Sequence, residues 1–436
     1  MAGAPLVTVI IPTYNWSAAL KCSVASVLNQ SVQDFEIRVV GDACSDDTAD
    51  VVAGFGDPRI SWFNLKKRHF SQYGGNNHAL SRAKGKFIAY LGHDDVWAPD
   101  HLKNALEAFE QTGADVCVSL ALVYGPPTSG IYCLTGLFPS DVFLPRHFCV
   151  PSSLMHRKSV IDTIGPWRAI EESKRPTDAD FLYRVHDHGL KVVSTKKLTT
   201  FKINAGWHRG AYARKSTAAQ TELLERMRSE PDFCETELVK FAQALMEGRY
   251  QPLSTFAEAG EALIERHYQA TRYKGAIEAR TENRVSGLDA ARIFPRDDTY
   301  QGFEWHHLEE RAEGTKLRWS GPAHVSVIEL DIALDAPCEI RIEVSGVIEP
   351  SLLETLRLAI DGRAVEYRQE KVKGRIWLVI DYVPAAPPDA TTPSCITFTL
   401  KNTRRPIDLG INQDRRFLGV AVADVVVVPQ KAEQTA

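Results

Sequence analysis

The stretch Lys86-Phe-Ile-Ala-Tyr-Leu-Gly-His-Asp-Asp-Val-Trp-Ala-Pro-Asp100 decides the fold of this chain. Its apolar run, Phe87 to Leu91, is typical of a buried strand and leads into two adjacent acids, Asp94 and Asp95. Ionised carboxylates at the end of a buried strand need a cation, a hydrogen-bond donor or water. Strand ends in open α/β sheets are also where ligands usually bind. Two interpretations compete: a ligand-binding pair of acids, and a solvated turn that caps the next helix.

Length and composition set the broad class. The chain has 436 residues, 44% of them hydrophobic and 24% charged, which is ordinary for a globular protein of two or three domains. The net charge of −4 gives no basic field for nucleic acid. No apolar run approaches the ~20 residues of a membrane span, and the N-terminus lacks the basic start of a signal peptide. The eight cysteines form no CxxC pair, so we expect reduced thiols in a cytoplasmic protein.

Strand-like and helix-like segments alternate in the first part of the chain. The runs Val7–Thr13, Phe35–Val40, Arg59–Leu65 and Phe87–Leu91 predict strands, with helical patterns between them. This alternation predicts a mostly parallel sheet with right-handed crossovers. Three of these strands end in polar clusters, at residues 13–15, at Asp42 and at residues 94–95. Because carboxyl ends of parallel strands share one edge, we expect the three clusters to meet.

The character of the chain changes twice further on. Residues from about 216 to 284 alternate apolar and charged faces in a helical pattern, and short β-rich runs punctuated by Pro, Gly and Asp follow. We predict an α/β domain over residues 1–212, a helical segment over 213–292 and an all-β sandwich over 293–430. Trp305 and Trp319 in the last region are either exposed glycan-binding residues or part of its core.

Four segments resemble, in order, motifs of the family-two glycosyltransferases with the A-type nucleotide-sugar fold. They are VTVIIPTYN (7–15), VVGDACSDDT (39–48), NHALSRAKGKFIAYLGHDD (77–95) and PTDADFLYRV (176–185). The resemblance covers about the first 210 residues. It implies a Rossmann-like mixed sheet, a nucleotide-sugar donor and a divalent cation, Mn²⁺ or Mg²⁺. It also extends, more weakly, to accessory β-sandwiches found beside bacterial glycosyltransferase domains.

The resemblance assigns a role to each motif. It implies that the donor nucleotide contacts Pro12, Thr13, Tyr14, Asn15, Asp42, Asn77 and Asp94. Tyr14 would lie against the base, and Asp42 would accept a hydrogen bond from a base N–H, which favours a uracil-like edge. Asp94 would bind the ribose or join the metal shell. Asp95 would coordinate the cation that bridges the diphosphate, a task that suits oxygen ligands.

Two further roles come from later in the chain. Asp178 is the expected general base, which takes the proton of the acceptor hydroxyl, with Asp180 as the alternative. Asp178 is equally suited to capping the helix that follows it. His208 is expected as a further metal ligand and Arg209 as a diphosphate contact, against the alternative that both are ordinary loop residues.

The sequence departs from the family at several positions. This chain has Gly41 where the family usually has the first acid of the second motif, and Gly92 where it usually has the acid before the metal motif. It has Thr177 where the family usually has a Glu before the base. Asp42, Asp95 and Asp178 are kept, so activity is expected, with the donor base in doubt.

The sequence therefore predicts an inverting, metal-dependent glycosyltransferase that uses a nucleoside-diphosphate sugar, with UDP expected, in bacterial surface polysaccharide synthesis. The acceptor would be a glycan or glycolipid, and the location cytoplasmic, including the inner face of the membrane. Peripheral membrane association and self-association through the C-terminal domain are open alternatives. A degenerate glycan-binding or assembly subunit is the competing function. A nucleotidyltransferase is disfavoured because no Gly-rich phosphate loop lies near the N-terminus.

Overall fold

The structure is a computed structural model. It describes residues 3–125, 130, 132–145, 147, 149–173, 175–203, 215–246 and 291–294, and residues 305–430 apart from 307, 312, 322, 323, 331, 385–393, 415 and 417.

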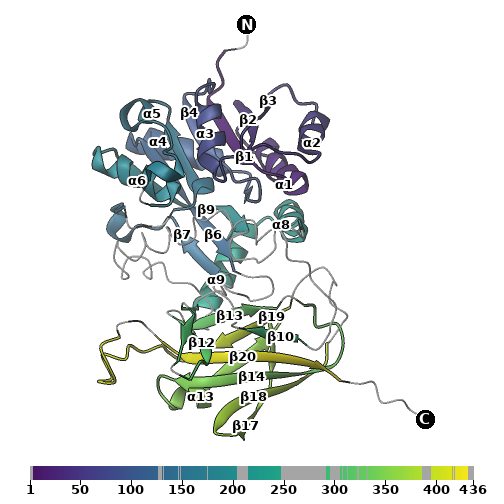
Figure 1. Ribbon diagram of the computed structural model, residues 1–436. Coiled ribbons are helices and arrows are strands. Elements are labelled where there is room, and N and C mark those ends of the chain that lie inside the picture. The colour runs from purple at the N-terminus through teal and green to yellow at the C-terminus, as the bar shows by residue number, and fades with distance from the viewer. Residues whose placement is uncertain are drawn as a thin grey trace, which may run out of the picture.

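The first part of the chain builds one mixed sheet (Figure 1). Its strands are β1 (Val7–Thr13), β2 (Phe35–Gly41), β3 (Ile60–Asn64), β4 (Phe87–Tyr90), β5 (Val96–Trp97), β6 (Val116–Tyr124), β7 (Tyr132–Thr135), β8 (Leu154–Arg157) and β9 (Val192–Ile203). The order is β3-β2-β1-β4-β8-β6-β9-β5, with β7 paired to β6. Strands β1 to β4 run parallel, and β8 runs antiparallel to β4 and β6. The predicted Rossmann-like mixed sheet is confirmed.

Helices cover both faces of this sheet. They are α1 (Ser17–Leu28), α2 (Thr48–Gly54), α3 (Gln72–Leu80), α4 (His101–Thr112), α5 (Ser159–Ile164) and α6 (Thr177–Asp187), with short 3₁₀ turns at Pro139–Asp141, Pro151–Ser153 and Ile170–Glu172. On one face Val24 of α1 and Phe109 of α4 pack with Ile37. On the other, Phe181 of α6 packs with Tyr90. The apolar runs of the strands are buried on both faces, which is why they read as continuous rather than alternating.

Two more helices, α8 (Ala218–Ser229) and α9 (Phe233–Met246), extend this core. Leu224 and Phe233 join a cluster with Leu122 and Phe201 of the sheet. The remaining predicted helical residues, 247–290, lie outside the described residues, and the three domain boundaries stay predictions. None of the helices that the structure describes has the length and apolarity that crossing a membrane requires.

The last strand of this sheet, β9, is continuous although its middle is polar. Its register against β6 shifts beside Leu120, and Lys196 takes a positive φ of 54°, so the strand continues across its polar middle. At the other end of the domain, Ser17 is the first residue of α1.

The N-terminus of α1 is capped by a residue of another loop, Asp46. Asp46 accepts hydrogen bonds from the backbone N–H of Ser17 (3.3 Å) and from that of Thr48 (3.2 Å). One carboxylate thus serves the N-termini of α1 and α2, where the helix dipoles favour negative charge. This ties the loops after β1 and β2 together.

The C-terminal part is a β-sandwich, drawn in green to yellow in Figure 1. One sheet contains β10 (Ala291–Phe294), β11 (Glu309–Glu310), β12 (Lys316–Trp319), β14 (Cys338–Val347), β17 (Arg368–Val372), β18 (Arg375–Tyr382) and β20 (Val420–Pro429). The other contains β13 (Val325–Glu329), β15 (Arg357–Ile360), β16 (Arg363–Val365) and β19 (Cys395–Thr399), and α13 (Ser351–Thr355) precedes β15. Ile342 and Val425 of the first sheet share a core with Phe398 of the second. The predicted all-β sandwich is confirmed.

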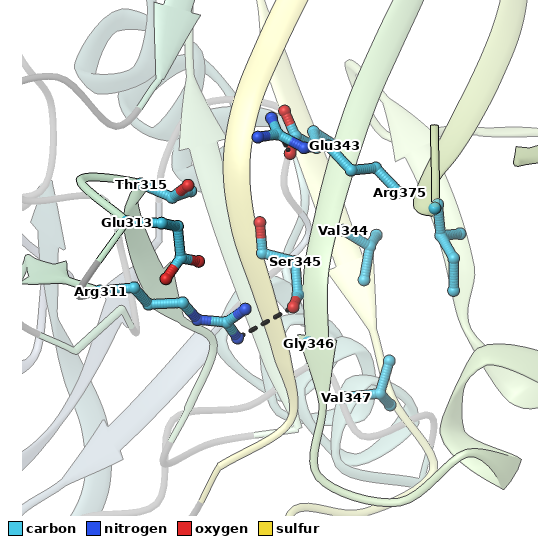
Figure 2. Close-up of a pocket in the computed structure, with 11 residues that line it drawn as sticks. Arg311, Glu313, Thr315, Glu343, Val344, Ser345, Gly346, Val347 and Arg375 are labelled. Atoms are coloured by element: carbon cyan, nitrogen blue, oxygen red, sulfur yellow. Dashed lines mark hydrogen bonds and ion pairs between the residues drawn. The ribbon is translucent and has the colours of Figure 1, made fainter. Parts of the chain in front are cut away.

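A groove of about 320 Å³ lies on the larger sheet (Figure 2). Arg311 crosses it and donates to the carbonyl of Ser345 (2.9 Å), while Arg375 pairs with Glu343 (2.9 Å). The two tryptophans of the sequence analysis pack with the core: Trp305 donates to the carbonyl of Val327 (3.0 Å), and the Trp319 ring packs against the same cluster. The structure therefore favours the core interpretation of both.

Candidate active site

The carboxyl ends of β1, β2 and β4 meet at one edge of the sheet. Thr13 pairs with Gly41 across β1 and β2, and Ile10 pairs with Tyr90 across β1 and β4. Asp42 donates its N–H to the carbonyl of Thr13 (2.8 Å), and the ring Nδ1 of His93 lies 3.3 Å from the carbonyl of Pro12. The three polar clusters are neighbours, as the alternation of strands and helices predicts.

The loop after β1 is built around Asn15. Its backbone takes a positive φ of 45°, a conformation that Asn tolerates better than most residues. Its side-chain oxygen accepts the N–H of Ser45 (2.7 Å), which joins this loop to the one after β2. Beside it the guanidinium of Arg68 lies 3.7 Å above the Tyr14 ring. One face of Tyr14 is thus covered by a cation, and a base would have to use the rest of the ring.

Asp42 holds the segment that carries this arginine. Its carboxylate accepts the backbone N–H groups of His69 (2.8 Å) and Phe70 (2.9 Å), and the Nδ1 of His69 lies 3.0 Å away. Phe70 has a positive φ of 57°, which the two N–H bonds stabilise. Asp42 therefore fixes the backbone at His69 and Phe70, and recognition of the base by Asp42 stays a prediction.

The acidic turn after β4 is held from four directions. Ser23 of α1 donates to the carbonyl of Asp95 (2.7 Å), and Gln220 of α8 donates to that of Asp94 (3.0 Å). Ser152 donates its hydroxyl to the Asp95 carboxylate and accepts the N–H of Gly92 (2.9 Å). A turn fixed by this many bonds presents its carboxylates in one geometry, so the solvated-turn interpretation is not what the structure shows.

The fourth contact is an ion pair with a lysine of the last strand. Asp95 is fully buried, and the ammonium of Lys202 lies 3.2 and 3.4 Å from its two carboxylate oxygens. The register explains the pair: β5 and β9 are antiparallel with Val96 opposite Phe201, which places Asp95 opposite Lys202. Burial raises the pKa of Asp95, while Lys202 opposes that rise. Burial alone would lower the pKa of Lys202, but the nearby carboxylates raise it.

The turn fits a divalent cation. A Cβ at Gly92 would lie 2.9 Å from Oδ2 of Asp95 and 3.1 Å from Oδ1 of Asp94, so the glycine lets both carboxylates come close to one point of the turn. In the described part of the chain no three acidic, histidine or cysteine side chains group into a complete metal site. Mg²⁺ is commonly held by one or two carboxylates together with substrate phosphates, and Mn²⁺ prefers the same oxygen ligands. Asp94 and Asp95 are therefore suited to a site that a substrate completes.

Asp178 stands at the first turn of α6, and its Oδ1 accepts the N–H of Ala179 (2.9 Å). Burial raises the pKa of Asp178, and the positive charge of Lys202 acts in the opposite direction. Asp178 in turn contributes to the raised pKa of Lys202. Asp178 and the acidic turn thus lie within electrostatic range of the same ammonium group.

Asp180, the alternative base, is engaged elsewhere. It is buried and pairs with Arg184 (2.8 Å) and Arg168 (3.1 Å), and Arg184 also donates to the carbonyl of Ile164. Each of its two oxygens is thus occupied by a guanidinium group, Oδ1 by that of Arg168 and Oδ2 by that of Arg184. The geometry favours Asp178 over Asp180.

The other predicted residues are placed as follows. Asn77 exchanges two hydrogen bonds with the backbone of Trp167, donating to its carbonyl (2.8 Å) and accepting its N–H (2.9 Å). Both ends of this amide link α3 to the segment before α6, so its donor contact stays a prediction. His208 and Arg209 lie outside the described residues.

The residues that hold the acidic turn after β4 were not predicted from the sequence. They are Ser23, Ser152, Lys202 and Gln220. Single Ser or Gln residues carry no signal in one sequence. Lys202 carried a weak one, because it is a charged residue between the apolar Phe201 and Ile203 at the end of a strand.

An α/β domain with an acidic turn at the carboxyl edge of its parallel strands is the class that the fold and site define. Residues 8–161 match the profile of glycosyl transferase family 2, and this segment is a domain of that family.

Similar proteins include an Escherichia coli protein named UDP-Glc:alpha-D-GlcNAc-diphosphoundecaprenol beta-1,3-glucosyltransferase WfgD, which is 37% identical over 98 residues, 22% of this chain and 38% of that protein. An uncharacterized glycosyltransferase of Nostoc sp. (strain PCC 7120) is 25% identical over 240 residues, 50% of this chain and 70% of that protein. The match to WfgD thus spans under two fifths of its length. The structure of S. aureus TarS 1–349 aligns at 17% identity and a TM-score of 0.39, covering 62% of this chain and 92% of that one.

Proposed function

We propose that this chain is an inverting, metal-dependent glycosyltransferase. It moves a sugar from a nucleoside-diphosphate sugar, with UDP as the expected nucleotide, to a glycan or glycolipid in bacterial surface polysaccharide synthesis. The observation that carries the proposal is that the buried Asp95 pairs with Lys202 (3.2 Å), while the charges of Asp94 and of the sequence-distant Asp178 also raise the pKa of that lysine.

Each acid has a task in this reaction. Asp94 and Asp95 would hold a divalent cation, which would supply positive charge to neutralise the departing diphosphate. Asp178 takes the proton of the acceptor hydroxyl as that oxygen attacks the anomeric carbon from the opposite side. Burial raises the pKa of Asp178, which makes it a stronger base than an exposed aspartate. A single displacement of this kind inverts the anomeric centre.

The match to glycosyl transferase family 2 supports transfer of a sugar. The name of the similar protein WfgD contains UDP-Glc and a diphosphoundecaprenol-linked sugar, which supports the donor and acceptor classes. A lipid-linked acceptor would place the protein in the cytoplasm at the inner face of the membrane. Self-association through the C-terminal sandwich is a further part of the proposal, to be tested by light scattering of the intact chain.

The test is a panel of nucleotide sugars screened by thermal shift with and without Mn²⁺, followed by a turnover assay on those that bind. We expect one UDP-sugar to raise the melting temperature in a Mn²⁺-dependent way and to be hydrolysed or transferred. Donor binding without turnover in any acceptor mixture would favour the competing function, a degenerate glycan-binding or assembly subunit. Failure of every nucleotide sugar to bind would refute both donor use and the assigned site.

A further inference from the structure

The Asp95–Lys202 pair occupies the carboxylate that the proposed function assigns to a metal. Oδ2 of Asp95 receives both the hydroxyl of Ser152 and the ammonium of Lys202, and Oδ1 also faces that ammonium. A divalent cation bound to Asp95 needs one of these oxygens. Lys202 and the metal therefore compete for the same lone pairs, and their charges repel at such short range.

Lys202 is able to leave. Its side chain is 20% exposed, whereas that of Asp95 is 0% exposed, so the lysine side chain reaches solvent and the carboxylate does not. A lysine side chain is a flexible four-carbon stem carrying a point charge, which readily changes partner. The cation belongs to the last strand of the sheet and the acid to the turn after β4, so the pair can open without unfolding either element.

The net charge of the acidic turn determines which group attracts the ammonium of Lys202. Two carboxylates and one ammonium leave a net charge of about −1 before any ligand binds. Binding of a divalent cation would make this net charge positive, and binding of a nucleoside diphosphate would make it negative again. The released ammonium is attracted to the same diphosphate.

We propose that Lys202 is a displaceable counter-cation: it neutralises Asp95 in the free protein and moves to the donor diphosphate when the metal enters. This rests on the proposed function for the identity of the donor. It makes the binding of metal and of diphosphate interdependent, because each favours the state in which Lys202 has left Asp95. Lys202 is thus a binding residue for the diphosphate and a competitor of the metal.

The experiment measures binding rather than turnover. Mn²⁺ is titrated into the intact protein and free Mn²⁺ is followed by electron paramagnetic resonance, with UDP absent and then present. In Lys202→Met, Mn²⁺ alone should bind at least about fivefold more tightly than in the native protein, the lower end of typical coupling between sites. UDP with EDTA should bind that variant at least about fivefold more weakly, and the gain in Mn²⁺ affinity on adding UDP should shrink.

Lys196→Met is the matched control, because Lys196 lies on the same strand, is 55% exposed and pairs with Asp141 away from the turn. It should leave all these affinities unchanged. Lys202→Arg keeps the charge and should bind Mn²⁺ no more tightly than the native protein, which covers the case in which Lys202→Met folds poorly. Equal or weaker Mn²⁺ binding in a folded Lys202→Met, or fivefold tighter binding in Lys202→Arg, would overturn the inference. Absence of UDP binding in every variant would instead count against the proposed function, and the titration with Mn²⁺ alone would still test Lys202.

Discussion

At the scale of single residues, Asp95, Asp178 and Asp180 lie in three different environments. Asp95 is fully buried against a lysine and a serine, Asp178 is half-buried at a helix start, and Asp180 is locked between two arginines. Identical side chains thus receive different tasks from their neighbours.

Replacing Asp95 should remove metal-dependent donor binding. Asp95→Ala takes away the most enclosed oxygen ligands and also leaves Lys202 without its closest partner, so the protein should lose stability as well. We expect UDP binding by calorimetry to become independent of Mn²⁺. Asp187→Ala, at an exposed acid of α6, is the control and should bind as the native protein does. Mn²⁺-dependent binding that survives in Asp95→Ala would show that another group holds the metal.

Replacing Asp178 should separate chemistry from binding. Asp178→Asn keeps the shape but cannot take a proton, so kcat should fall on the order of 10²–10⁴-fold while the affinity for UDP stays the same. Asp180→Asn breaks a buried pair with Arg184 and should instead lower the free energy of unfolding, by about 3–5 kcal/mol. A normal kcat with weakened UDP binding in Asp178→Asn would contradict its assignment as the base.

The pH profile should report the raised pKa of Asp178. A general base works only when ionised, so activity is lost as the pH falls through its pKa. Because burial raises that pKa above the ordinary 3.8, the acid limb of kcat/KM should lie above pH 3.8. Lys202 opposes the rise, so the limb should move to still higher pH in Lys202→Met. A limb that does not move in this variant would show that the two groups do not interact, and one that moves to lower pH would contradict the assigned direction.

At the scale of elements, the site depends on how closely β4 approaches β1. Gly85 precedes β4, and a Cβ there would lie 2.4 Å from the backbone N of Thr8 and 2.7 Å from the carbonyl carbon of Val7. The neighbouring atoms are backbone and cannot turn aside. A glycine at this position is what allows the strand carrying the acidic turn to pair with β1.

Gly85→Ala should therefore destabilise the protein by about 1–3 kcal/mol, the usual cost of overpacking. Gly54→Ala is the matched control, since that glycine lies in α2 with no atom within 4 Å of its would-be Cβ. It should be neutral or slightly stabilising. Chemical denaturation of both variants measures the difference, and equal stability would mean that β1 and β4 separate at little cost.

At the scale of the whole molecule, the described residues form separate cores. The clusters of the α/β part contain residues up to Phe241, and the sandwich cluster begins at Trp305. No hydrophobic cluster of the described residues combines the two. Since each part has a hydrophobic core of its own, we expect each to unfold as its own cooperative unit.

Calorimetry should show two unfolding transitions. Phe181→Ala should lower only the transition of the α/β part and Phe398→Ala only that of the sandwich, each by about 3–5 kcal/mol. Mn²⁺ with UDP should raise only the first. A single transition that both substitutions shift equally would show that the parts unfold together.

The local sequence decided much of the fold. Apolar runs at Val7–Thr13 and Phe87–Leu91 marked buried strands, and the acids that follow strands marked the binding edge, because carboxyl ends of parallel strands share that edge. The sandwich followed from short β-branched runs with Pro and Gly between them. These are properties of neighbouring residues, so one sequence carries them.

Only the tertiary structure decided which groups face these acids. Lys202 lies 107 positions from Asp95, and their pairing depends on the antiparallel register of β9 with a two-residue strand too short to leave a pattern. At Gly41, where the family usually has an acid, a Cβ would lie 2.5 Å from the Trp62 ring of the neighbouring strand β3, so a side chain does not fit there. Such contacts are set by how strands pair and twist in three dimensions, and periodicity along the chain does not encode them.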